Sequence, residues 1–185
     1  MHDEWGFDYS TRMSVELLEF ATDGMLGKLT RWLRMLGHDV KYFEALDDRQ
    51  LIRAAMSEHR ILLTRDLGLS QQALSHEAEV FLVKGETEVE RLAELARRFD
   101  LQLEIDMTAS RCPKCNAQIK SISKDKIFKR IPHRTALHYQ EFWICLNCEQ
   151  IYWRGAHWKR IDESLSAARE LRDSDPKRPT SSGST

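Results

Sequence analysis

Short apolar runs alternate with amphipathic segments along about the first hundred residues of the chain. The apolar runs lie at residues 15–21, 39–43, 61–64 and 80–83. Apolar residues also recur at spacings of three and four in segments that begin near Met25, Asp47 and Thr87. The runs are typical of strands and the spacings of helices. Their alternation predicts an α/β fold in which helices cover both faces of a parallel sheet.

Residues with known capping preferences mark the ends of these predicted helices. Gly37 is placed to follow the first helix, because glycine readily adopts the left-handed conformation that ends many helices. Asp47 and Asp48 are placed to begin the second helix. Thr87 and Glu90 form a capping-box pattern before a further apolar face. The local signals therefore agree with the periodicity.

Charge divides the chain into an acidic body and a basic segment. Residues 1–110 hold 13 Lys and Arg against 21 Asp and Glu, a net charge of −8, whereas residues 111–160 hold 11 against 3, a net charge of +8. We therefore expect an N-terminal extension (1–14), an α/β domain (15–110), a basic module (111–161), and a short helix with a disordered tail (162–185). The basic module predicts a polyanionic partner, with a merely solvated surface as the alternative.

Composition limits the class of protein. Hydrophobic residues make up 42% and charged residues 31% of the 185 residues, with 8 Gly and 4 Pro, which excludes a collagen-like or wholly disordered chain. No apolar stretch approaches the roughly 18 residues of a membrane helix, and the acidic, polar start does not resemble a signal peptide. We expect a soluble cytoplasmic protein with no membrane partner.

All four cysteines lie in the basic module as two C-x2-C pairs. Cys112 and Cys115 form the first pair, and Cys145 and Cys148 form the second after 29 intervening residues. Four thiolates make a closed tetrahedral site, which predicts one structural zinc. The β-type sequence between and after the pairs indicates a zinc ribbon. Two disulfides, or a thioredoxin-like redox site, are the alternatives.

Basic and aromatic side chains are interleaved between the two cysteine pairs, a mixture that holds phosphates and stacks on bases. The candidates for such contacts are Lys129, Arg130 and Arg134. His157 is a further candidate for a substrate contact, with a packed histidine at the edge of the ribbon as the alternative.

Three aspartates are predicted to gather at the carboxyl ends of the parallel strands, where ligands bind in open sheets. Asp23 follows the first strand and Asp66 the third, while Asp48, or its neighbour Asp47, begins the helix between them. Three carboxylates this close favour a hard cation, magnesium or manganese. Each has a structural alternative, as a turn residue or a helix N-cap. Basic residues nearby would hold phosphate: Lys28, Arg31, Arg34 and Arg65.

Several motifs in order resemble the C-terminal RNase domain family named after the exonuclease mut-seven. The matching pieces are residues 20–40, 48–51 and 60–66, the two cysteine pairs, and residues 151–158. The resemblance covers roughly residues 17–160. It implies a PIN-like nuclease fold with a fused zinc ribbon, metal-dependent RNA cleavage, and Asp23, Asp48 and Asp66 as the acidic residues.

The residues and the resemblance together predict a metal-dependent ribonuclease that needs no organic cofactor and holds RNA on its basic ribbon. The first alternative is a non-catalytic RNA-binding or ribosome-associated protein, in which the acids are only turns and caps. A receiver-like or phosphatase-like α/β domain is disfavoured, because the chain lacks the Asp-x-Asp or acid pair expected after its first strand.

Overall fold

A parallel sheet forms the centre of the first part of the chain in the computed structural model, which describes residues 18–174. Its strands are β1 (Glu19–Asp23), β2 (Asp39–Phe43), β3 (Ile61–Thr64) and β4 (Val80–Leu82). They pair in the order β2-β1-β3-β4, and every pairing is parallel. The predicted α/β class is therefore confirmed. The first strand lies later than the run at 15–21 indicated, and residues 15–17 fall outside the described part.

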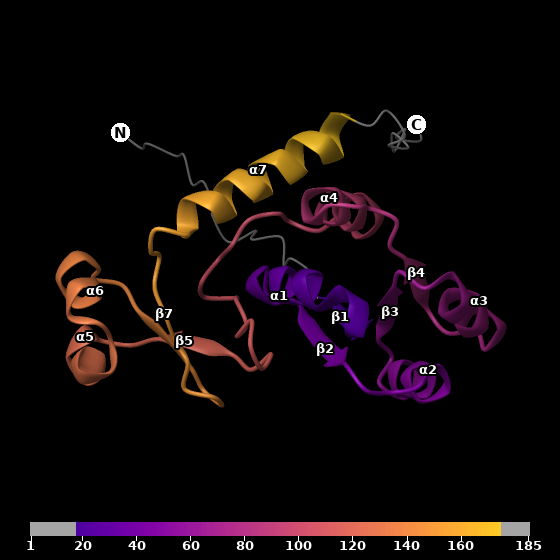
Figure 1. Cartoon of the computed structure of the whole chain (residues 1–185), viewed down its shortest axis with the longest axis horizontal. Coiled ribbons are helices and arrows are strands. Elements are labelled where there is room, and N and C mark those ends of the chain that lie inside the picture. The colour runs from indigo at the N-terminus through magenta and orange to yellow at the C-terminus, as the bar shows by residue number, and fades with distance from the viewer. Residues whose placement is uncertain (1–17, 175–185) are drawn as a thin grey trace, which may run out of the picture.

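Helices cover both faces of this sheet (Figure 1). They are α1 (Gly27–Met35), which follows the short 3-10 turn η1 (Gly24–Leu26), then α2 (Asp48–Ser57), α3 (Leu67–Ser75) and α4 (Glu88–Phe99). Phe20 and Leu63 belong to the core on the α1 and α4 side, whereas Ala21 and Leu62 belong to the core on the α2 and α3 side. This alternation follows from strand geometry, in which successive side chains point to opposite faces.

Two of the predicted caps are present at the helix starts. The Asp47 side chain accepts a hydrogen bond from the Gln50 N–H, and the Gln50 side chain accepts one from the Asp47 N–H, so α2 begins with a capping box. Thr87 and Glu90 form the same arrangement at α4. Each cap satisfies backbone donors that have no partner within the helix.

The second part of the chain holds a small antiparallel sheet with the order β5-β6-β7. Its strands are β5 (Ile119–Ser121), β6 (Trp143–Cys145) and β7 (Ile151–Tyr152). The segment between the cysteine pairs is not all β-structure, because it also forms α5 (Lys124–Ile127), the 3-10 turn η2 (Phe128–Arg130) and α6 (His133–His138). Ile127, Ile131 and Phe142 close a small core of their own beneath these turns.

The last helix, α7 (Trp158–Ser174), is longer than the short helix expected beyond residue 161. It runs back over the α/β domain and packs against α4 (Figure 1). Leu165 and Ala168 are buried at this contact and belong to the main core. The expected tail falls mostly in residues 175–185, outside the described part. No helix within residues 18–174 is long and apolar enough to cross a bilayer.

The main core runs through the expected boundary near residue 110. Phe20 and Leu33 of the α/β domain share one cluster of buried side chains with Cys112, Ile119 and Trp143 of the cysteine module. The two parts therefore pack as a continuous structure, which sequence-based division by charge does not reveal.

Candidate functional site

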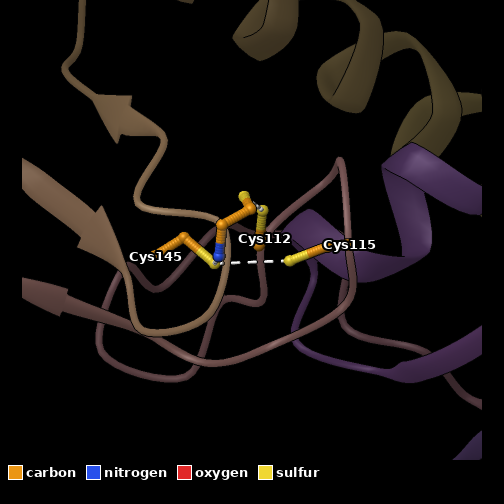
Figure 2. A group of neighbouring side chains, drawn as sticks. Cys112, Cys115 and Cys145 are labelled. Carbon is orange, nitrogen blue, oxygen red and sulfur yellow. Dashed lines mark hydrogen bonds between the residues drawn. The ribbon is translucent and has the colours of Figure 1, made fainter.

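The four cysteines converge on one point between the α/β domain and the small sheet. Figure 2 shows Cys112, Cys115 and Cys145 with their sulfurs turned toward one another. The Sγ atoms of all four cysteines lie within 4.8 Å of one another. Cys115 and Cys145 are 3.4 Å apart, and Cys112 and Cys148 are 3.6 Å apart. The structure thus brings together every predicted zinc ligand.

These distances fit a metal and exclude disulfides in this arrangement. A tetrahedral zinc with Zn–S bonds of about 2.3 Å separates its sulfurs by about 3.8 Å. A disulfide requires about 2.05 Å, and all four cysteines are free. The donor set is therefore consistent with one zinc, and four protein ligands leave no open position for water.

Neighbouring groups stabilise negative charge on Cys115, whereas burial raises the pKa of Cys145. Cys145 Sγ lies 3.4 Å from the N–H groups of Asn147 and Cys148, as in a zinc knuckle. Although burial raises the pKa of Cys115, hydrogen bonds from the Ala117 N–H and from the other thiols lower it to about 6. The Tyr152 hydroxyl lies 3.0 Å from Cys112 Sγ, and burial together with this contact raises the pKa of Tyr152. Tyr152 therefore keeps its proton and can donate it in a hydrogen bond to Cys112 Sγ.

The acidic edge of the sheet is built around Thr64. Its hydroxyl donates to Asp23 Oδ2 over 2.5 Å and accepts a hydrogen bond from the Asp66 N–H over 2.9 Å. Asp23 is the last residue of β1 and Asp66 caps α3, so one fully buried hydroxyl links the ends of two neighbouring strands. Sequence reasoning treated Thr64 only as a strand residue. Its position two residues before Asp66 was the available signal.

The remaining carboxylate oxygens have different surroundings. Asp23 Oδ1 accepts from the Met25 N–H over 2.8 Å, and Asp66 Oδ1 accepts from the Leu69 N–H over 3.0 Å. Asp66 Oδ2 accepts no hydrogen bond from another described residue and is accessible, because Asp66 is exposed. A Cβ at Gly68 would lie only 3.1 Å from Asp66 Oδ1, so glycine leaves room for this carboxylate. Asp66 thus retains a free ligand atom.

Asp48 lies exposed in the first turn of α2, beside the N-cap Asp47. Because α2 follows β2 and precedes β3, its N-terminus belongs to the same edge of the sheet as Asp23 and Asp66. Within residues 18–174, the cysteines are the only group of three or more acidic, His or Cys residues whose ligand atoms all lie within 4.8 Å. The three aspartates therefore share an edge without forming such a group.

The four basic residues predicted to hold phosphate lie in different environments. Lys28 and Arg31 are exposed on α1 and pair with no other described residue. Arg65 Nη2 lies 3.3 Å from the Glu86 carboxylate. Arg34 does not present its charge to solvent, because it is 7% exposed and all three of its guanidinium nitrogens donate to backbone carbonyls. These carbonyls belong to Val40, Pro113 and Lys114, so Arg34 joins the two parts of the chain.

The predicted RNA contacts of the basic module lie in two places. Lys129, Arg130 and Arg134 lie on the helical insertion (residues 124–138), and His157 directly precedes α7. Lys129 and Arg134 are exposed and pair with no other described residue. Arg130 is engaged with Glu149, whose carboxylate lies 3.3 Å from its guanidinium. His157 is exposed and lines an apolar cavity of about 180 Å³ together with Trp153 and Trp158. The sequence did not indicate this cavity. Of the three predicted cations on the insertion, two are thus unpaired within the described residues.

Comparison with known proteins identifies one family. The family model described as the Mut7-C RNAse domain matches residues 18–165, which is most of the chain and spans both the acidic edge and the four cysteines. No curated protein and no solved structure matched the chain.

Proposed function

The chain belongs to the Mut7-C RNAse domain family, and from this membership we propose that it is a metal-dependent ribonuclease that uses its acidic edge to hydrolyse RNA. The family description implies RNA as the substrate. The observation that carries the proposal is the Asp23–Thr64–Asp66 arrangement at the carboxyl edge of the sheet. Ligands of open parallel sheets bind at this edge.

The donor atoms there suit a hard cation. Asp23, Asp48 and Asp66 would hold Mg²⁺ or Mn²⁺, because both prefer carboxylate oxygens. The bound cation supplies activation of water and neutralises charge that develops on the phosphate. Thr64 fixes the direction of the Asp23 carboxylate, and Asp66 contributes the oxygen that has no partner within the described residues.

Basic side chains around this edge would position the RNA. Lys28 and Arg31 on α1, and Arg65 before Asp66, are close in sequence to the acids and would contact phosphates near the scissile bond. Lys129, Arg130 and Arg134 on the insertion, with His157 beside the last helix, would contact RNA farther from the acids. A zinc bound by the four cysteines would hold this second surface in place and would take no part in the chemistry, since its ligand shell would be closed.

The test compares Asp66→Asn with wild type on end-labelled single-stranded and hairpin RNA, with manganese and with chelator. Asparagine keeps the size of the side chain and its capping role but removes the charge that binds the cation. Turnover should fall by about a hundredfold or more, while RNA affinity is unchanged or rises. Asp100→Asn is the matched control, because Asp100 is exposed at the end of α4 and its left-handed backbone conformation suits asparagine. Equal manganese-dependent cleavage by wild type and Asp66→Asn would contradict the proposal.

A non-catalytic RNA-binding protein is the second candidate. Asp23 and Asp66 both accept backbone hydrogen bonds as caps, and the three aspartates do not converge within 4.8 Å. In that case wild type would bind RNA and no metal would produce cleavage.

A further inference from the structure

A groove of about 430 Å³ lies where the α/β domain meets the cysteine knuckles. Arg31 of α1 and Tyr42 of β2 line it from the α/β domain, while Lys114 and Gln150 line it from the two knuckles. Arg34 lies between them and donates hydrogen bonds to carbonyls on both sides. The groove is therefore formed by both parts of the chain.

The charged side chains that line this groove are all positive. Arg31 and Lys114 are exposed, and neither side chain makes an ion pair or a hydrogen bond with another described residue. No Asp or Glu is found among the described residues that line the groove. Two unpaired cations in a lining without a carboxylate create a local potential that attracts anions. A phosphate-bearing ligand is the chemistry that this surface favours.

The groove also reaches toward the acidic edge. The Tyr42 hydroxyl, which lines the groove, donates to the Gly24 carbonyl over 3.1 Å. Gly24 directly follows Asp23, and η1 leads from there into the helix that carries Arg31. A chain-like anion held in the groove can therefore extend to Asp23 without crossing the core.

The two sides of the groove are held rigidly together. Besides the bonds of Arg34, the Asn116 side chain accepts from the Val40 N–H over 3.1 Å and donates to Asp39 over 2.8 Å. Arg111 pairs with the same Asp39 carboxylate over 3.2 Å. A groove that is formed before its ligand arrives loses little conformational entropy on binding.

We propose that this junction groove binds the phosphate backbone of a single RNA strand and leads it to the acidic edge. The inference rests on the proposed ribonuclease function and adds the path of the substrate. A groove of this volume is in the range that holds one small molecule, and so takes nucleotides of one strand rather than a duplex. Lys129 and Arg134 then contact RNA beyond the groove.

The experiment reverses the two free cations together, as Arg31→Glu with Lys114→Glu. RNA affinity is measured by fluorescence anisotropy on a labelled single strand, without divalent metal and at several salt concentrations. Loss of two phosphate contacts should weaken binding at least about tenfold and reduce the slope of log affinity against log salt by roughly 1.4. Arg53→Glu with Arg98→Glu makes the same change of charge on α2 and α4, away from the groove, and should change affinity by less than about threefold.

A second measurement locates the RNA directly. Single strands that contain 4-thiouridine should crosslink to Tyr42 or to Gln150 and its neighbours in wild type. Crosslinks confined to residues 124–138, with affinity in the groove variant equal to that of its control, would overturn the inference.

The two proposals fail separately. If the groove variant binds RNA as wild type does while wild type still cleaves with manganese, the groove is not the path and the ribonuclease function stands. If the groove variant loses binding while Asp66→Asn cleaves as well as wild type, the groove binds RNA and the acidic edge is not the catalytic site.

Discussion

The four-cysteine cluster and the acidic edge both collect side chains that bind metals, yet they are built in different ways. The cysteines come from two tight knuckles, and all four sulfurs lie within 4.8 Å of one another. Asp23 ends β1 and Asp66 caps α3, and the Thr64 hydroxyl links the two residues. Asp48 lies exposed at the start of α2. The four cysteines can fill all the coordination positions of a zinc ion. The acidic edge would leave coordination positions of its metal open to water or substrate.

This difference separates a structural site from a site open to substrate. Four protein ligands close a zinc site, and such a site contributes to folding. A site that performs chemistry must keep a position for water or substrate, and Asp66 Oδ2 offers an oxygen with no partner within the described residues. Three experiments test the comparison.

The largest effect is expected from Cys145→Ser, which removes one zinc ligand. The sequence alone, with its two knuckles and few apolar residues around them, leads us to expect loosening of residues 111–160 while the α/β domain is spared. Because Cys145 and Leu33 share one core, the structure predicts instead that the whole chain loses several kcal/mol of unfolding free energy. Thermal unfolding by circular dichroism and zinc content by elemental analysis, about one per chain in wild type, measure this.

Leu146→Ser is its control, since Leu146 lies between the same cysteines but is 54% exposed. It should keep zinc and melting temperature. A Cys145→Ser protein in which the α/β domain melts as in wild type would contradict the shared core.

A smaller effect is expected at the acidic edge from Thr64→Val, which keeps the shape of the side chain but removes its hydroxyl. Asp23 Oδ2 then loses its donor, and leaving a buried carboxylate oxygen unsatisfied costs about 1–3 kcal/mol of unfolding free energy. Manganese-dependent cleavage should fall about tenfold or more, because Asp23 is no longer oriented. Thr64→Ser retains the hydroxyl and should restore both properties. Full cleavage by the valine variant would show that the Thr64 link does not serve the reaction.

The most gradual effect, spread over more than two pH units, separates the acid sensitivity of the α/β domain from that of the cysteines, which release metal on protonation. His38 is 1% exposed, its Nδ1 accepts from the Leu18 N–H, and burial lowers its pKa from 6.5 to about 4. Between pH 6.5 and 4 the unfolded chain therefore binds more protons than the folded one. Stability should fall with falling pH by at most about 1.4 kcal/mol per unit, and it is fully present above pH 6.5.

Denaturant unfolding of wild type and His38→Gln between pH 7 and 4.5 measures this contribution. The difference between the two proteins should shrink as the pH falls, because glutamine does not titrate. A constant difference across the range would show that His38 does not titrate in this window.

Much of the architecture follows from patterns that are local in sequence. The strands predicted at 39–43 and 61–64 coincide with β2 and β3. β3 is buried on both faces, as is typical of a short apolar run in a parallel sheet, whereas β2 at the edge is mostly half-buried. The capping box of Thr87 and the two cysteine pairs could also be predicted, because the two residues of the box, and the two cysteines of each pair, lie three residues apart.

The features that escaped prediction depend on contacts between distant residues. Arg34 on α1 resembles a phosphate ligand in sequence, yet its partners include the Pro113 carbonyl, 79 positions away. Thr64 lies 41 positions from Asp23. The small helices between the cysteine pairs bury Ile127 against Phe142, which no short periodicity indicates. Such pairings are fixed by the tertiary fold and leave little trace in a local pattern.

The packing of the last helix, α7, against α4 affects how the protein folds during translation. Leu165 and Ala168 fill a core whose first members, Phe20 and Leu26, leave the ribosome well over a hundred residues earlier. Until α7 has emerged, the growing chain presents an uncovered apolar surface on α4, the kind of surface that promotes aggregation. We expect translation products that stop before residue 158 to bind chaperones, and completion of the last helix to release them.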